Sequence, residues 1–308
     1  MMLEKLRQSD TVREKELGDG ISSFNFTRDA FYRGDWNESS TIARGLFVDT
    51  ETGDVVARSY PKFFNFNEGK YNTLPWLEDN LQFPVFGYEK YNGFLGILSW
   101  DSKHGKLFFA SKSTTESDFA GWFKSIFNST CDIAKVESYL RSNSKSLVFE
   151  VIDPTNDPHI IEYSEGRCVL LDAIDNSFEY GKLEYGELCT LGVELGLEVK
   201  RMVTTVPDFA TLSSLLENGF SEGGFIEGLV FEDSAGYMFK FKFDYYCKWK
   251  RRRSLKERVQ NGREVSAQAL CEEDRKFLSF ICDYYSPAVL AEKSLIDIRN
   301  DYEIYGEL

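Results

Sequence analysis

The chain has 308 residues and a formal net charge of −14. This acidic balance argues against a protein that coats nucleic acid non-specifically, and the presence of only two histidines makes histidine triads and histidine-rich metal sites poor candidates. Six scattered cysteines without a CxxC pair argue against structural zinc and a disulfide framework. No apolar run reaches the length of a membrane span, and residues 1–5 lack the apolar segment of a signal peptide. We therefore expect a cytoplasmic protein with one large or two unequal domains.

The first half of the chain alternates between short apolar runs and turn residues, which is typical of strands. The predicted strands cover residues 41–48, 54–60, 85–100 (a region of paired strands) and 106–112. Apolar side chains at helical spacing over 119–127 predict an amphipathic helix that Ser117 or Asp118 caps. A second helix is predicted over 131–140.

The second half returns to strands and then ends in helices. The predicted strands are 147–152, a hairpin of 159–163 with 167–173, and a last hairpin of 224–232 with 237–244. The predicted helices cover 183–195, 207–216 and much of 264–300. Because the strands come in adjacent pairs rather than in βαβ units, we expect an α+β fold built on antiparallel sheets.

A dense positive run over residues 248–258 stands out against the acidic background. A run of this kind is usually a solvated helix face. Its position directly after the last predicted strand also fits contact with a phosphate backbone. The sequence leaves both interpretations open.

Charged residues interrupt several of the predicted apolar strands. In the last strand, Phe239, Phe241 and Phe243 alternate with Lys240 and Lys242, so the phenylalanines should face the core and the lysines a site or solvent. Paired lysines at this spacing suit the oxygens of a phosphate chain.

Glu150 and Glu227 raise the same question, because each lies within an apolar strand. A carboxylate in such a run is usually paired or functional. Lys90 lies in the middle of another such stretch, within Lys90-Tyr91-Asn92-Gly93. Taken alone, Lys90 is better explained as a surface residue on an edge strand, because a four-residue pattern recurs by chance. An amine nucleophile needs a lowered pKa, so that its neutral form is available. Apolar surroundings or nearby cations lower the pKa of an amine, and Lys240 and Lys242 would be such cations.

Together these elements resemble the covalent nucleotidyltransferases, and within them the phage T4-type RNA ligase 1 family and the ligase domain of fungal tRNA ligases. The matching elements are, in chain order, Ala43-Arg44-Gly45-Leu46-Phe47, Tyr60-Pro61-Lys62-Phe63-Phe64-Asn65, Lys90-Tyr91-Asn92-Gly93, Ser111-Lys112-Ser113, Phe149-Glu150, Glu227-Gly228-Leu229-Val230 and Lys240-Phe241-Lys242. The resemblance covers roughly the first 250 residues, and the ordered set is far more specific than any single element.

The resemblance implies an α+β nucleotidyltransferase fold of two packed antiparallel sheets with helices outside and the nucleotide in the groove between the sheets. It also implies an ATP-dependent RNA ligase that uses Mg²⁺ or Mn²⁺ and joins RNA 3′-OH and 5′-phosphate ends through lysyl-AMP and an adenylylated RNA end. The expected role is repair or splicing of RNA, including tRNA. Separate end-healing enzymes are expected as partners, and no association with a membrane is expected.

The resemblance further implies a role for each matching residue. The implied catalytic residues are Lys90, Lys240, Lys242 and Glu227. The implied nucleotide-binding residues are Arg44, Lys62, Phe64, Glu89, Asn92, Gly93, Lys112, Glu150, Glu227, Lys240 and Lys242. Glu227 and Glu150 are expected to hold the metal, mainly through water.

Two features depart from the family pattern. Asn92 stands where the commonest motif has Asp, although fungal tRNA ligases also carry Asn there. We predict an adenylyltransferase domain over 1–250 and a small helical domain over 251–308. The latter matches neither the tRNA-reading domain of the phage enzyme nor the kinase and phosphodiesterase domains of fungal tRNA ligases.

The alternatives to an RNA ligase are another covalent nucleotidyltransferase, such as a DNA ligase or capping enzyme, and a non-catalytic RNA-end-binding protein on the same scaffold.

Overall fold

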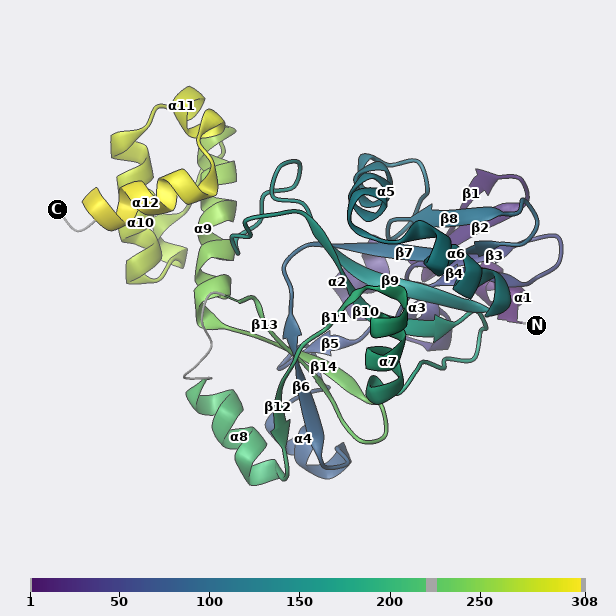
Figure 1. Cartoon of the computed structure of the whole chain (residues 1–308). Helices are drawn as coiled ribbons and strands as arrows, with labels where there is room; N and C mark the ends of the chain where they lie inside the picture. Colours follow the sequence, from purple (N-terminus) through teal and green to yellow (C-terminus); the bar gives the residue numbers. More distant parts are fainter. Residues whose placement is uncertain (1, 220–225, 306–308) are drawn as a thin grey trace.

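The computed structural model describes residues 2–219 and 226–305 and has the predicted α+β architecture, with sheets flanked by helices (Figure 1). The N-terminal sheet has the order β1 (Val12–Gly18), β2 (Ile21–Phe26), β3 (Leu46–Asp49) and β4 (Val55–Arg58). The β6 sheet has the order β12 (Met202–Val206), β6 (Val85–Lys90), β13 (Gly228–Glu232), β14 (Met238–Lys242) and β5 (Phe64–Asn65). The β9 sheet has the order β11 (Glu198–Val199), β10 (Arg167–Asp175), β9 (Lys145–Ile152), β7 (Phe94–Asp101) and β8 (Lys106–Ala110).

Pairing within the three sheets is antiparallel, except that β5 runs parallel to β14 and β11 runs parallel to β10. The helices of the first 219 residues are α1 (Met2–Gln8), α2 (Arg28–Arg33), α3 (Glu38–Ile42), α4 (Leu74–Asn80), α5 (Asp118–Thr130), α6 (Ile133–Ser142), α7 (Tyr185–Leu195) and α8 (Phe209–Asn218). Those that follow β14 are α9 (Asp244–Gln260), a 3₁₀ turn at Ala267–Ala269, α10 (Glu272–Tyr284), α11 (Pro287–Glu292) and α12 (Leu295–Tyr305). None of the helices in the described part of the chain combines the length and apolar character that a membrane crossing requires.

The β6 and β9 sheets bury their outer faces under different helices. On the β6 sheet, Phe231 and Phe239 pack with side chains of α4 and α8. On the β9 sheet, Phe149 packs against Phe123 and Phe127 of α5, with ring centroids 5.6 and 5.5 Å apart. Each buried aromatic ring of this size contributes on the order of 2–3 kcal/mol.

The inner faces of the same two sheets approach each other. Val148 of β9 and Met238 of β14 belong to one buried cluster, which joins the sheets at that point. Strand alternation then places Lys240 and Lys242, two and four residues beyond Met238, on this inner face of β14. The predicted split between a phenylalanine face and a lysine face is confirmed, since Phe239 and Phe243 are buried.

Most predicted elements are present, and the differences have local causes. Ser117 caps α5, as expected, by accepting a hydrogen bond from the Ala120 amide. Residues 41 and 42 end a helix rather than begin a strand, because Asn37 and Ser40 form a capping box that starts α3. Gly224 and Phe225, which the prediction included in the strand 224–232, lie outside the described residues.

Two predicted pairings are wrong. The region 85–100 contains β6 and β7, but these strands belong to different sheets. Residues 159–163 form no strand, and β10 pairs with β9 instead. Ile160 and Ile161 are apolar because they are buried among the C-terminal helices, not because they belong to a hairpin.

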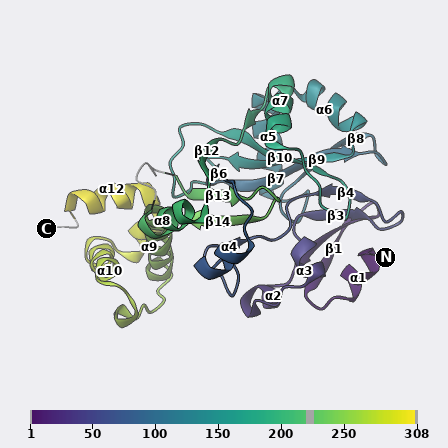
Figure 2. The ribbon, with the colours of Figure 1, turned by 90° about the horizontal axis from the view of Figure 1, so that it is seen from below.

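The C-terminal helices gather at one end of the molecule (Figure 2) and share a core that also contains Ile160 and Ile161. Trp249 and Leu255 of α9 pack with Phe277 of α10 and Ile298 of α12. Helix α9 runs continuously through the predicted boundary between residues 250 and 251, and Figure 1 shows this helix linking the sheets to the helical module. The division into two domains stays a prediction.

The basic run lies on α9 and is partly structural. Arg252 is 2% exposed and lies 4.8–4.9 Å from the ring centroids of Trp249, Phe277 and Tyr302. Arg251 forms an ion pair of 2.8 Å with Asp274 of α10. These arginines therefore hold the module together, which neither interpretation of the sequence had foreseen.

Candidate active site

Lys90 is the last residue of β6, and the next three residues carry the chain from the β6 sheet to the β9 sheet. The crossing is tight at Gly93, where a Cβ atom would overlap the carbonyl oxygen of Val151 in β9. Only glycine therefore fits at this position. The motif Lys90-Tyr91-Asn92-Gly93 thus presents an amine at the point where the two sheets meet.

Glu227 is the centre of the polar cluster around Lys90. Its carboxylate is almost fully buried and lies 2.9 Å from the Lys90 ammonium and 2.7 Å from the Lys242 ammonium. The amide nitrogen of Asn92 donates a hydrogen bond of 3.1 Å to the same carboxylate. Burial by itself would raise the pKa of Glu227, but the charges of Lys90 and Lys242 outweigh it and lower the pKa.

Glu150 approaches the cluster from β9. One of its carboxylate oxygens accepts a hydrogen bond of 2.9 Å from the Gly93 amide. Burial raises the pKa of Glu150, although the charges of Lys90 and Arg44 oppose this shift. Burial also lowers the pKa of Arg44, which donates a hydrogen bond of 3.4 Å to Ser59.

Lys240 is the most strongly perturbed lysine of the cluster. Its ammonium lies 4.1 Å from the ring centroid of Phe63. Burial lowers its pKa well below the ordinary value, and the neighbouring charges of Arg44, Lys90, Lys62 and Lys242 lower it further. A group of cations this close together is costly in the free protein and would be relieved by an anion such as a phosphate chain.

Lys62 is another cation of the cluster, and its charge contributes to the lowered pKa of Lys240. It forms an ion pair of 3.0 Å with Glu68, and its ammonium lies 3.9 Å from the ring centroid of Phe64. Burial lowers the pKa of Lys62, although the Glu68 charge opposes this. Phe64 therefore contacts the cluster through the ammonium of Lys62.

One predicted residue lies apart from the cluster, and another lies at its rim. Glu89 occupies the opposite face of β6 from Lys90, where it forms an ion pair of 2.9 Å with Arg201. Lys112 follows β8 and is exposed, with its ammonium 4.5 Å from the ring centroid of Phe26. Lys112 lies at the rim of the site, because its carbonyl is close to Gly45, the neighbour of Arg44.

Sequence reasoning missed the residues that hold Asn92. The backbone amide of Asn92 donates to the Tyr163 hydroxyl at 2.9 Å, and its side-chain oxygen accepts from the Ile161 amide at 3.2 Å. Lys242 was predicted, but Tyr246, whose ring centroid lies 4.8 Å from its ammonium, was not. Tyr163 and Ile161 lie 71 and 69 residues beyond Asn92, so only tertiary folding brings them together. Tyr246 follows Lys242 closely across the junction of β14 and α9, so its proximity in the sequence could have suggested it.

The surroundings of Asn92 predict the effect of restoring the commoner Asp. In Asn92→Asp, a carboxylate would replace the amide that now donates to Glu227, so two carboxylates would face each other. We expect the free energy of unfolding at neutral pH to fall by about 1–3 kcal/mol, measured by urea denaturation. Asn67→Asp makes the same change at an exposed position and serves as the control. Equal stability of the wild type and the Asn92→Asp variant would contradict this account.

The two carboxylates also bear on metal binding. Among residues 2–219 and 226–305, no group of three or more His, Cys, Asp and Glu side chains converges as a metal site. Glu150 and Glu227 both reach the cluster, and a pair of carboxylates suits Mg²⁺, which keeps several water ligands. The residues present therefore fit a metal that is held largely through water.

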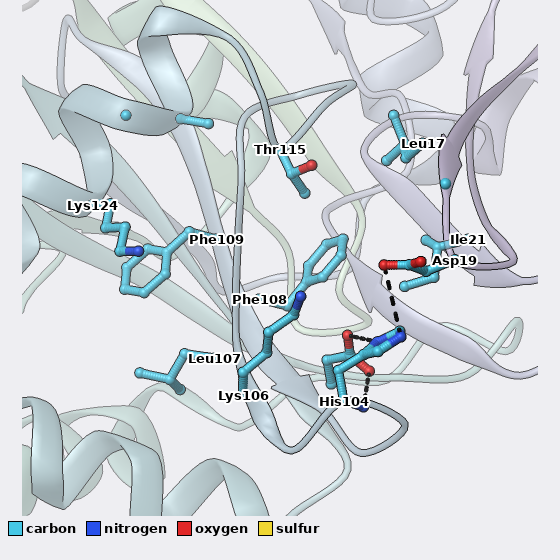
Figure 3. A pocket seen from close by; sticks show the side chains of 14 residues that line it. Leu17, Asp19, Ile21, His104, Lys106, Leu107, Phe108, Phe109, Thr115 and Lys124 are labelled. Carbon is cyan, nitrogen blue, oxygen red and sulfur yellow. Dashed lines mark hydrogen bonds and ion pairs between the residues drawn. The ribbon is translucent and has the colours of Figure 1, made fainter.

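A separate pocket of about 280 Å³ lies between the N-terminal sheet and α5 (Figure 3). Its lining includes Asp19, His104, Lys106 and Lys124, and the His104 ring lies 2.6 Å from the Asp101 carboxylate. The described residues that line this pocket include none of the predicted site residues. The Lys90 cluster is therefore the stronger candidate for an active site.

Comparisons with known proteins identify the fold and the family of the chain. The solved structures that resemble the chain include a putative ATP-dependent DNA ligase from Aquifex aeolicus, with a TM-score of 0.57 and 14% identity over 99% of this chain and 80% of that one. They also include an archaeal ATP-dependent RNA ligase in two forms, with TM-scores of 0.58 and 0.56 and identities of 14% and 15% over 99% of this chain and 76% of that one. At these identities the likeness shows the fold.

A comparison with curated proteins found no match. The sequence profile of a protein family described as RNA ligase, of the T4 RNA ligase 1 type, matches residues 42–246, which is more than half of the chain. The matched range contains every residue of the Lys90 cluster. The chain therefore belongs to this RNA ligase family.

Proposed function

We propose that the protein is an ATP-dependent RNA ligase that carries AMP on Lys90. The observation that supports this most strongly is the position of the Lys90 amine, 2.9 Å from a buried carboxylate and among the cations Lys240, Lys242, Lys62 and Arg44, in a chain whose net charge is −14. An acidic protein that gathers cations around one amine is suited to binding the triphosphate of ATP.

In the first step, the Lys90 nitrogen attacks the α-phosphorus of ATP. The neutral amine, formed when the ammonium loses a proton to solvent, makes a phosphorus–nitrogen bond and gives up a second proton, while the bond between the α-phosphorus and the bridging oxygen breaks and pyrophosphate leaves. Glu227 holds the amine in place through its ion pair. Lys240 would neutralise the α-phosphate, while Arg44, Lys62 and Lys242 would hold the outgoing pyrophosphate and, later, RNA phosphates.

In the second step, an oxygen of an RNA 5′-phosphate attacks the same phosphorus. The phosphorus–nitrogen bond breaks and the Lys90 amine is released. In the third step, an RNA 3′-hydroxyl attacks the adenylylated 5′-phosphate, AMP leaves, and a phosphodiester bond forms.

Mg²⁺ or Mn²⁺ would neutralise phosphate charge as ATP and RNA react. Glu150 and Glu227 would hold the ion through water. We further propose a role in RNA repair, with tRNA among the substrates and separate enzymes that heal the RNA ends. The six cysteines, all within the described residues, are free, which suits the reducing cytoplasm proposed here.

Labelling the wild-type protein tests the proposal. Incubation with α-³²P-labelled ATP and Mg²⁺ is expected to label the protein covalently, and addition of 5′-phosphorylated RNA is expected to move the label to the RNA. Unlabelled GTP should not compete at the same concentration. Labelling by GTP alone, or transfer to nicked DNA but not to RNA, would instead support another nucleotidyltransferase. RNA binding without any covalent label would support a non-catalytic RNA-end-binding protein.

A further inference from the structure

A row of aromatic rings passes beside Lys62, one of the cations of the Lys90 cluster. We define this aromatic row as Phe26, Trp36, Phe64, Tyr71, Trp76 and Tyr237. Successive rings along it have centroids 5.0, 5.3, 6.2, 5.9 and 5.0 Å apart. The rings come from segments far apart in the sequence, which include β2, β5 and α4.

The aromatic row forms the wall of a pocket of about 370 Å³. Trp36, Phe64, Tyr71, Trp76 and Tyr237 line it together with Lys62. This volume lies within the range of about 300–1,000 Å³ that is usual for small-molecule sites. Tyr71 is 36% exposed, so the pocket opens to solvent at a tyrosine ring.

Hydrogen bonds hold the wall of the pocket in place. The buried Asn72 accepts a hydrogen bond of 2.6 Å from the Tyr237 hydroxyl and donates one of 3.2 Å to the Asn65 carbonyl. Asn72 has a φ of +60°, a conformation that asparagine tolerates better than most residues. The adjoining Glu68 accepts a hydrogen bond of 2.7 Å from the Asn65 amide. The rings are therefore ordered before any ligand arrives, which lowers the entropic cost of binding.

Positive charge lies along the same wall. The Lys62 ammonium is 3.9 Å from the ring centroid of Phe64 and 5.1 Å from that of Trp36. The Lys70 ammonium is 5.1 Å from the ring centroid of Tyr71. Aromatic rings next to cations are the two components with which proteins bind single-stranded nucleic acid, since bases stack on the rings and phosphates meet the cations.

The chemistry of the proposed second step fixes which RNA strand would lie here. The attacking 5′-phosphate must approach the AMP phosphorus in line with, and opposite to, the Lys90 nitrogen that leaves. That position is the one from which pyrophosphate departs, and Lys62 is among the residues proposed to hold it. The nucleotide attached to that phosphate then lies at the mouth of the aromatic pocket.

We infer that the pocket stacks an unpaired base adjacent to the 5′-phosphate of the RNA that receives AMP. The inference rests on the proposed function and adds to it a binding site for one substrate strand. It makes the enzyme selective for 5′ ends whose first bases are unpaired, because a paired base cannot enter a pocket lined by rings on several sides.

Tyr71→Ala tests the inference with least risk to the fold, because Tyr71 is partly exposed. The KM for a 5′-phosphorylated single-stranded RNA, measured as transfer of AMP from ATP to RNA, is expected to rise by about 5- to 150-fold. Tyr71→Phe keeps the ring and is expected to restore the wild-type KM. Tyr284→Ala removes a tyrosine that is 54% exposed from α10 and is expected to leave the KM unchanged.

An RNA that lacks its first two bases provides the second arm of the experiment. Abasic RNA is expected to bind the wild type more weakly than normal RNA, but to bind Tyr71→Ala as normal RNA does, because the stacking partner is already lost. Direct binding, measured by fluorescence anisotropy without ATP, reads this out even if no lysyl-AMP forms. If the proposed function is wrong, ATP will not label the wild-type protein. If the inference is wrong, Tyr71→Ala will bind RNA as tightly as the wild type does.

Two results would overturn the inference. One is an unchanged affinity of Tyr71→Ala for RNA. The other is a raised KM for ATP in the labelling reaction with an unchanged affinity for RNA, which would assign the pocket to the adenine of ATP.

Discussion

The Lys90→Arg variant is expected to fold, to bind ATP and to acquire no AMP. Arginine can keep an ion pair with Glu227, which lies 2.9 Å from the lysine ammonium, so the charges of the buried cluster stay balanced. A guanidinium group is not deprotonated at neutral pH and cannot supply the nucleophilic lone pair. Covalent labelling with α-³²P-labelled ATP should therefore fall to background, which makes this the largest effect that we predict.

The matched control is Lys135→Arg, which makes the same change at a lysine whose side chain is 60% exposed on α6. This control should label like the wild type. Urea denaturation of both variants separates loss of chemistry from loss of folding. Labelling of a folded Lys90→Arg protein at the wild-type rate would show that another residue carries AMP.

The Lys240→Met variant is expected to be more stable than the wild type and nearly inactive. Burial lowers the pKa of Lys240 well below the ordinary value, and the nearby charges of Arg44, Lys90, Lys62 and Lys242 lower it further. Methionine has a similar length and no charge, so the free energy of unfolding at neutral pH should rise by about 1–4 kcal/mol, the range found when buried charged groups are replaced by packed apolar ones. The rate of self-adenylylation should fall by about 100-fold or more, because a group that stabilises the transition state is lost.

The stability difference between this variant and the wild type should depend on pH. Between the lowered pKa of the folded state and the ordinary value of 10.5, the unfolded wild-type chain binds a proton at Lys240 that the folded protein does not. The wild type therefore gains stability relative to Lys240→Met as pH rises through this interval. The difference should be largest at low pH and smallest above 10.5. A wild type that is more stable than the variant at neutral pH would contradict this account.

Such an exchange of stability for activity is expected where a site is arranged for an absent ligand. The free protein already contains part of the compensation, because the Glu227 carboxylate lies between Lys90 and Lys242. Glu68 lies in the same way against Lys62. Binding of a triphosphate would supply the remaining negative charge.

Much of the cluster around Lys90 could be predicted from the sequence. Alternation along strands with one buried face separates Lys240 and Lys242 from the phenylalanines between them, and the structure has this arrangement. The same alternation separates Glu89 from Lys90, since adjacent residues of a strand face opposite sides. The resemblance to a family predicted Glu89 as a nucleotide-binding residue, and in the structure its carboxylate forms an ion pair with Arg201.

What could not be predicted depends on contacts between segments distant in the sequence. Tyr163 and Ile161 hold Asn92, although the apolar pattern around them predicted a strand. That pattern reflects burial against α9 and α10, and periodicity does not distinguish burial in a sheet from burial under helices. The sequence also could not show that Lys90 lies where the chain crosses between two sheets. Strands β6 and β7 are separated by three residues, as the strands of a hairpin are.

Asn92 is explained by the same distant contacts. Its amide nitrogen binds Glu227 while its oxygen binds the Ile161 backbone, a combination of donor and acceptor that an ionised Asp cannot provide. The departure from the commoner motif therefore matches the local hydrogen bonding, and the Lys90 amine keeps the carboxylate that positions it.

Mapping the covalent adduct tests the central claim most directly. The wild-type protein would be incubated with ATP and Mg²⁺, digested, and analysed by tandem mass spectrometry for peptides that carry the mass of AMP. We expect the adduct on the lysine of Tyr88-Glu89-Lys90-Tyr91-Asn92-Gly93 and its absence from the same peptide region in Lys90→Arg. An adduct on Lys240, Lys242 or any other lysine, with Lys90 unmodified, would contradict the account.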